Sequence, residues 1–168
     1  HTTIQSAIDA SVSGDIITVS AGTYEENLLI ESKSIVLQGV DEDARDTTRI
    51  SGSGSSATTT IVGGVVNISN LTISGGTTGI SITTNAVSEL TNLVVENNVG
   101  AEEGGGIAIA SNSDVVLNNL LIQNNEATYG GGVYLAANAK KLRISDSTIR
   151  DNTGTESGGG IYTSAPFL

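Results

Sequence analysis

Apolar residues alternate with small or polar ones in short runs along most of the chain. From Val65 onward, valine, isoleucine and leucine take every second position of these runs, as in Ile107-Ala108-Ile109. A period of two is typical of strands with one buried face, and the glycine triplets between the runs argue against helices. We therefore predict three strands per repeat. The expected inward side chains are Ile80, Ile82, Ile107, Ile109, Val133, Leu135 and Ile161 in the first strand, Val66, Ile68, Leu90, Val115, Leu117, Leu142 and Ile144 in the second, and Leu71, Ile73, Leu93, Val95, Leu120, Ile122 and Ile149 in the third.

The runs recur at a fixed period. Val95, Ile122 and Ile149 each end the third strand and stand at steps of 27 residues, and each is followed by an Asn- or Asp-containing turn and a glycine triplet. A fixed period of this length indicates a solenoid in which each coil buries its apolar face on its neighbours. The triplets are Gly104–Gly106, Gly130–Gly132 and Gly158–Gly160.

The first residues follow a different pattern. Ile4, Ala7 and Ile8 have the spacing of one helix face, and Thr2 or Thr3 is a suitable N-cap. A short amphipathic helix here would shield the first strand edge of the stack. We therefore expect a helical cap over residues 1–15.

A single domain is expected over residues 1–168. Residues 16–64 would form irregular first coils, in which a longer loop between Asp41 and Thr60 contains a strand near Arg49 and Ile50. Residues 65–168 would form regular coils of which the last is incomplete. An open strand edge recruits other chains. We therefore expect that the sequence is the ordered part of a longer solenoid or that this end docks on a further subunit, as in a filament.

Two columns of Asn and Asp recur at the turns beside the third strand. Stacked amides one coil apart can pass hydrogen bonds along the solenoid, and Asn tolerates the left-handed backbone of a sharp bend. We predict a structural ladder at both columns. The first column is Asn70, Asn92, Asn119 and Asp146, and the second is Asn98, Asn125 and Asn152.

The composition argues against several kinds of binding partner and of catalytic site. The chain has a net charge of −11 and no cysteine, which argues against nucleic-acid binding, disulfides and thiol catalysis. No apolar run approaches the length of a membrane span, so membrane insertion is not expected. The lone histidine, His1, cannot build a triad or a three-histidine zinc site away from the terminus.

Three segments near the start resemble the opening of pectate-lyase-like right-handed parallel β-helix proteins. They are Thr3–Ala10, Gly14–Val19 and Ala21–Asn27. The Ile-x-x-Asn and Gly-Gly-Gly-Ile repeats resemble those of bacterial and archaeal surface β-helix proteins of the polymorphic outer-membrane-protein type. The resemblance covers most of the chain and implies an all-β, right-handed parallel β-helix, here of about six coils with a short N-terminal capping helix.

In enzymes of that superfamily, the resemblance places the substrate cleft on the outer face of the first strand. The outward column of that strand is Ser81, Ala108, Tyr134 and Tyr162, which contains no carboxylate, arginine or lysine. A glycosidase needs two carboxylates across the bond, and a lyase needs a base with charge neutralisation. We therefore predict no catalytic residues. Stacked Tyr134 and Tyr162, with Tyr129 in the adjacent loop, are instead a candidate polysaccharide-binding surface.

Calcium is the remaining candidate ion. Glu102 and Glu156 stand two residues before their glycine triplets, and a further acidic group occurs at Asp41, Glu42 and Asp43. Calcium requires six to eight oxygen ligands in a cage, and no loop has a recognisable ligand spacing. We expect solvated acidic loops, no metal site and no cofactor.

The function favoured by these residues is a non-enzymatic structural or adhesive β-solenoid, extracellular or on the cell surface, as a filament subunit or part of a larger surface protein. One alternative is a polysaccharide lyase or hydrolase whose catalytic coils lie outside this sequence. Another is a carbohydrate-binding module that uses the tyrosines. Expected partners are a polysaccharide, and further coils or a second copy at the open C-terminal edge.

Overall fold

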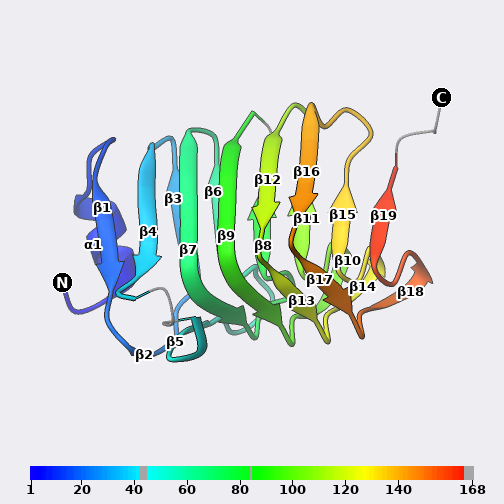
Figure 1. The fold of residues 1–168 in the computed structure, drawn as a ribbon, viewed down its shortest axis with the longest axis horizontal. Helices are drawn as coiled ribbons and strands as arrows, with labels where there is room; N and C mark the ends of the chain where they lie inside the picture. Colours follow the sequence, from blue (N-terminus) through cyan, green and yellow to red (C-terminus); the bar gives the residue numbers. More distant parts are fainter. Residues whose placement is uncertain (42–44, 84, 165–168) are drawn as a thin grey trace.

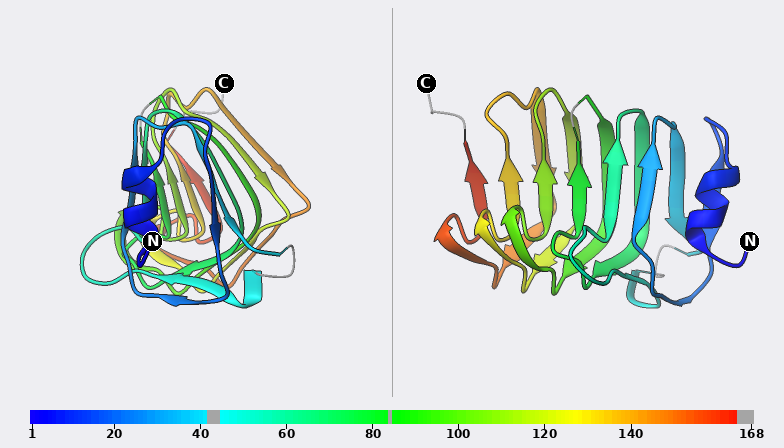
Figure 2. Two further views of the ribbon diagram at one scale, coloured as in Figure 1. Left: turned by 90° about the vertical axis from the view of Figure 1, so that its left-hand side faces the viewer. Right: turned by 180° about the vertical axis from the view of Figure 1, so that it is seen from behind.

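The computed structural model describes residues 1–41, 45–83 and 85–164, and these residues form a parallel β-helix (Figure 1). Successive coils lie over one another along one axis, and the view from the N-terminal end shows their superimposed outlines (Figure 2). Two faces of the solenoid are each six strands deep. This confirms the predicted all-β solenoid with a short helix at its N-terminal end.

The first face is the main path of a ten-stranded sheet. Its strands are β1 (Ile16–Val19), β4 (Ile35–Gly39), β7 (Val65–Ser74), β9 (Val87–Glu96), β12 (Asp114–Asn118) and β16 (Lys141–Ser145). The same sheet continues around a corner through β2 (Gly22–Tyr24), β5 (Thr48–Ser51), β13 (Leu121–Gln123) and β17 (Thr148–Arg150).

The second face is a six-stranded sheet, and a small three-stranded sheet lies between the two faces in the later coils. The six strands are β3 (Leu28–Glu31), β6 (Thr59–Val62), β8 (Ile80–Ile82), β11 (Ile107–Ile109), β15 (Val133–Leu135) and β19 (Ile161–Thr163). The three strands are β10 (Val99–Glu103), β14 (Glu126–Tyr129) and β18 (Thr153–Ser157).

Two features of the strands differ from the expected three per coil. β7 and β9 each run through the corner as one ten-residue strand, and the chain bends at Asn70 and Asn92, whose φ angles are 59° and 52°. β10, β14 and β18 were not predicted, because they lack regular alternation. Their pairing contains register shifts, one of them between Val99 and Ala101.

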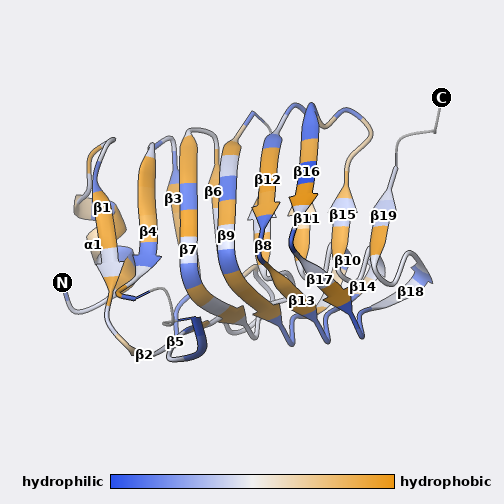
Figure 3. Cartoon of the chain, viewed as in Figure 1, coloured by the Kyte–Doolittle hydropathy of each residue, from blue (hydrophilic) through white to orange (hydrophobic). Residues whose placement is uncertain are grey.

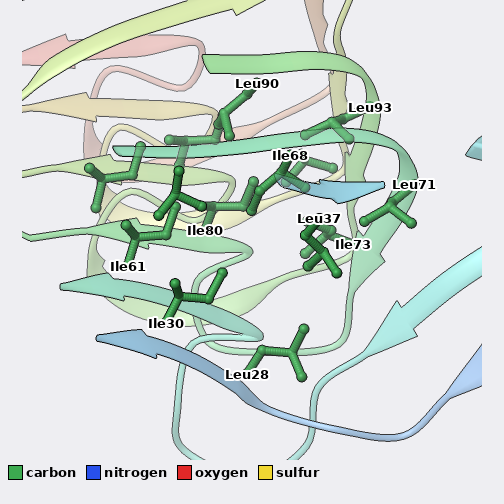
Figure 4. Close-up of a cluster of buried hydrophobic side chains, with 14 of the residues drawn as sticks. Leu28, Ile30, Leu37, Ile61, Ile68, Leu71, Ile73, Ile80, Leu90 and Leu93 are labelled. Carbon is green, nitrogen blue, oxygen red and sulfur yellow. The ribbon is translucent and has the colours of Figure 1, made fainter. Parts of the chain in front are cut away.

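The core is a continuous column of aliphatic side chains inside the coils. The inward residues predicted for the middle coils, such as Ile68, Leu90 and Ile107, are fully buried. Figure 4 draws part of this cluster of core side chains and labels Ile68, Leu90 and eight others. The apolar residues follow the strands in Figure 3. In the last coil the same positions are only half-buried, and Ile161 is 48% exposed.

The predicted cap is α1 (Ile4–Ala10), with Thr3 as its N-cap. The Thr3 hydroxyl accepts the backbone N–H of Ser6, and the Ser6 hydroxyl is bonded in return to the N-cap backbone, forming a capping box. Ile4 and Ile8 are 4% and 1% exposed and belong to the core. The helix therefore continues the apolar column of the coils.

Two charged side chains, one just before β3 and one just after it, are hydrogen-bonded to the two ends of α1. The Glu26 carboxylate accepts the first two helical N–H groups at 2.9 Å each. At the other end, Lys33 Nζ donates to the carbonyl oxygens of Asp9 and Ser11, also at 2.9 Å each. An acid at a helix N-terminus and a cation at its C-terminus both complement the helix dipole.

In the described parts of the chain, no helix is long and apolar enough to cross a membrane.

Candidate functional site

The structure brings the three predicted tyrosines together at one corner of the last two coils. Tyr134 and Tyr162 are paired in register on β15 and β19, and their rings are stacked with centroids 5.8 Å apart and planes 14° apart. The ring of Tyr129, at the end of β14, lies 5.3 Å from that of Tyr162 at 41°. We call Tyr129, Tyr134 and Tyr162 the tyrosine cluster.

Two glutamates act on this cluster, and one of them, Glu156, is hydrogen-bonded to it. The Tyr129 hydroxyl donates to the Glu156 carboxylate, and this bond is the main reason that the pKa of Tyr129 is raised. Burial raises the pKa of Tyr134, which is 8% exposed; a hydrogen bond with Ser164 acts in the opposite direction, and one with Glu103 raises it further. The cluster thus combines aromatic rings with carboxylate oxygens.

The sequence analysis did not single out Glu103, and it considered Glu156 only as a calcium ligand, because its search for chemistry on the first strand was limited to the outward column. That column does lack acids, but β10 and β18 bring Glu103 and Glu156 alongside it. A register shift in the small sheet aligns Glu103, Tyr129 and Ser157 across neighbouring coils. All three immediately precede a glycine triplet, so this position in the repeat was the available signal for Glu103.

The glycine triplets explain how three elements meet so closely. Gly104, Gly130 and Gly158 have φ angles of 67°, 67° and 66°, a left-handed turn that links the small sheet to the next strand. A Cβ atom on Gly106 would lie 2.5 Å from the carbonyl oxygen of Gly132. Glycine therefore allows successive coils to stack at this corner, which places Tyr129 beside Tyr162.

The comparisons with known proteins agree with this architecture. A family model described as right-handed beta helix region matches residues 17–166. The chain belongs to this β-helix family. No curated protein sequence matches it.

Solved structures with the same fold include pectin methylesterases. A mutant in complex with a hexasaccharide has a TM-score of 0.51 at 15% identity, over 87% of this β-helix and 63% of that chain. The enzyme from Aspergillus niger, in penultimately deglycosylated form, has a TM-score of 0.50 at 16% identity, over 98% of this β-helix and 77% of that chain. The β-helix described here spans less than two thirds of the first of these proteins, and at such identities the likeness concerns the fold alone.

The first Asn column lies on the outside of the β-helix at the corner of the first face. Asn92 Nδ2 donates to Asn70 Oδ1 at 2.9 Å, and Asn119 Nδ2 donates to Asn92 Oδ1 at 3.1 Å. Asn119 and Asp146 have left-handed φ angles of 54° and 50°. The side chains of this column are partly or fully exposed. It combines the turn conformation with a row of amide hydrogen bonds.

The second column is buried and more densely bonded. Asn98 and Asn125 are 0% and 1% exposed. Asn98 Nδ2 donates to Asn125 Oδ1 at 2.8 Å, and Asn125 Nδ2 donates to Asn152 Oδ1 at 3.0 Å and to the carbonyl oxygen of Val95 at 2.9 Å. The left-handed turn residues beside this column, which the sequence analysis did not single out, are Asn97, Asn124 and Asp151.

A third row of polar side chains was also missed. Arg49 Nη2 and Gln123 Nε2 each donate to the Glu96 carboxylate at 2.8 Å, and Arg150 donates to Gln123 Oε1. Burial raises the pKa of Glu96, but the bonds from Gln123 and Arg49 and the charge of Arg49 outweigh it and hold this pKa below its usual value. Glu96, Gln123 and Arg150 share one register, which was the signal in the sequence.

Within the described residues, no three His, Asp or Glu side chains converge as metal ligands. Glu42 and Asp43, part of the predicted acidic group, lie outside these residues. His1 lines a hollow of about 420 Å³ at the N-terminal end, between α1 and β1. The absence of a calcium site and the absence of a cofactor both remain predictions.

Proposed function

We propose that this β-helix is a non-enzymatic structural and adhesive solenoid, extracellular or on the cell surface, that binds a polysaccharide at the tyrosine cluster. The observation that carries the proposal is the convergence of three aromatic rings and two carboxylates at one corner. Aromatic rings pack on the apolar faces of sugars, and carboxylate and phenol oxygens bond sugar hydroxyls. The proposed location follows from the proposed ligand, since a structural polysaccharide would be bound outside the cell.

The chemistry at the cluster supports binding over catalysis. Glu156 is held by the Tyr129 hydroxyl, and no lysine, arginine or histidine occurs in the strands that build the two sheets at this corner. Lyase chemistry needs a base together with charge neutralisation. The proposal includes a solenoid that is a filament subunit or part of a larger surface protein and carries this binding surface.

The test is calorimetric binding to soluble polysaccharides and oligosaccharides of several classes. Tyr162→Ala should lower the affinity at least about tenfold, because it removes the outermost ring of the cluster. Leu29→Ala is the matched control, since Leu29 lies in the same outward column at the other end of the six-stranded sheet. Absence of binding to every glycan, or equal losses in both variants, would reject the proposal.

The second candidate is a polysaccharide hydrolase, which the two glutamates beside one aromatic surface favour. Hydrolysis of a glycosidic bond uses a pair of carboxylates. Release of reducing ends from a bound polysaccharide that disappears in both Glu103→Gln and Glu156→Gln would establish this candidate. We expect no release above background.

A further inference from the structure

The charges around the tyrosine cluster are all of one sign. The Tyr129 hydroxyl donates to the Glu156 carboxylate, and Glu103 is paired in register with Tyr129 in the small sheet. The bond to Glu156 comes from a neutral hydroxyl group. It therefore leaves the negative charge of that carboxylate without neutralisation.

The positive charges of the chain belong to other strands and turns. The seven lysines and arginines of the sequence are Lys33, Arg45, Arg49, Lys140, Lys141, Arg143 and Arg150. Those within strands lie on β5, β16 and β17, which are part of the ten-stranded sheet. None lies on the six-stranded sheet or on the small sheet. A ligand at the cluster thus meets negative charge on strands that supply no cation.

One ring of the cluster is placed to receive a ligand. Tyr162 is paired in register with Tyr134 and stacks on it. Tyr134 is almost fully buried, whereas Tyr162 and Tyr129 are partly exposed. A sugar ring stacked on Tyr162 would lie at the same corner as the Glu156 carboxylate.

We propose that the tyrosine cluster selects a polymer of protonated amino sugars, such as chitosan, and rejects polyuronates; this rests on the proposed function. An ammonium group forms charge-assisted hydrogen bonds with Glu103 and Glu156, which are stronger than bonds to a neutral hydroxyl. A uronate carboxylate placed there is repelled by these glutamates. The glycan class is thus set by charge, and the rings supply the stacking surface.

The experiment compares three oligosaccharides of equal length by calorimetry: glucosamine, N-acetylglucosamine and galacturonate oligomers. The measurements use a mildly acidic buffer in which the glucosamine amines carry a proton. We expect the glucosamine oligomer to bind at least about tenfold more tightly than its acetylated form, because acetylation removes the charge that strengthens the bond. The galacturonate oligomer should show no measurable binding.

Variants separate a local site from the overall negative charge. Glu103→Gln and Glu156→Gln should each lower affinity for the glucosamine oligomer several-fold and leave that for the acetylated oligomer nearly unchanged. Glu126→Gln is the control, because Glu126 is an exposed acid of the same small sheet and the change in net charge is identical. An equal loss in Glu126→Gln would overturn the inference, since general attraction would then explain the preference.

The outcomes also distinguish this inference from the proposed function. Binding of the galacturonate oligomer as tightly as the glucosamine oligomer would overturn the amino-sugar preference and leave polysaccharide binding standing. Absence of binding to all three oligomers, and to the wider set of glycans, would reject both. Binding of the glucosamine oligomer that is lost in Tyr162→Ala and weakened in Glu156→Gln supports both.

Discussion

The first and the last described coils are built from the same kind of strands, but their inward side chains are buried to different extents. At the N-terminal end, α1 buries Ile4 and Ile8 against the coils and is fixed by Glu26 and Lys33. At the other end, Ile161 occupies an inward position and is still 48% exposed. In a solenoid each coil is stabilised mainly by its neighbours. The same position of the repeat therefore contributes differently to the free energy of unfolding in different coils, because its contribution depends on the coil that packs against it.

Matched glycines give the sharpest test of this comparison. A Cβ on Gly132 would lie 2.4 Å from the carbonyl oxygen of Gly160, whereas a Cβ on Gly160 has Ile149 Cγ2 as its nearest neighbour at 3.8 Å. Gly132→Ala should lower the free energy of unfolding by about 2–3 kcal/mol through overpacking, and Gly160→Ala by less than about 0.5 kcal/mol. Urea denaturation measures both. Equal losses would show that the last coil is covered as closely as the one before it.

The buried Asn column provides the next largest effect. Asn125→Ala removes the acceptor of the backbone and side-chain N–H groups of Asn98 and the donor to the carbonyl oxygen of Val95, and should cost about 2–3 kcal/mol. Asn119→Ala, in the exposed column, should cost about 1 kcal/mol, mainly through its left-handed φ of 54°. Asn119→Gly should recover part of that loss. A larger cost at Asn119 than at Asn125 would contradict the assignment of the buried column as the stronger ladder.

The cap is tested by removing one of its anchors. Lys33→Ala removes the ammonium group that bonds the C-terminal carbonyls of α1, and should lower stability by about 1–2 kcal/mol. Lys140→Ala changes an exposed lysine of the last coil and should have little effect. Hydrogen exchange should rise first in α1 and β1 of the Lys33 variant. Exchange that rises equally along the whole solenoid would argue against a separable cap.

The fold could be predicted from the sequence because the repeat is both periodic and local. Alternation identified the inward side chains of the middle coils, and the helical spacing of Ile4 and Ile8 identified α1. The half-buried last coil could not be seen in this way, because burial there depends on whether a further coil covers the strand. The same alternation is present in Leu142 and Ile144 as in Val115 and Leu117, with different burial.

The candidate site was predicted in part. The tyrosines were found because two of them share a register position one coil apart. Glu103 and Glu156 were not assigned to the tyrosines because β10 and β18 lack alternation and pair with register shifts, so spacing alone does not place their side chains. The row through Glu96 was missed for a different reason. Its members are of different residue types, and a search for the same residue at the same position of each repeat does not find them.

The smallest expected effect concerns that row, which links the coils on the outside of the ten-stranded sheet. Because the pKa of Glu96 is lower in the folded protein than in the unfolded chain, the unfolded chain takes up the proton more readily as the pH falls. The stabilisation is present above the ordinary glutamate pKa and is lost as the pH falls through the folded value. Urea denaturation from neutral to acidic pH should therefore show a shallower decline for Glu96→Gln than for the unmodified chain. Glu89→Gln, an exposed control on the same strand, should keep the original slope, and an unchanged slope in Glu96→Gln would show that this row contributes nothing to the pH dependence of stability.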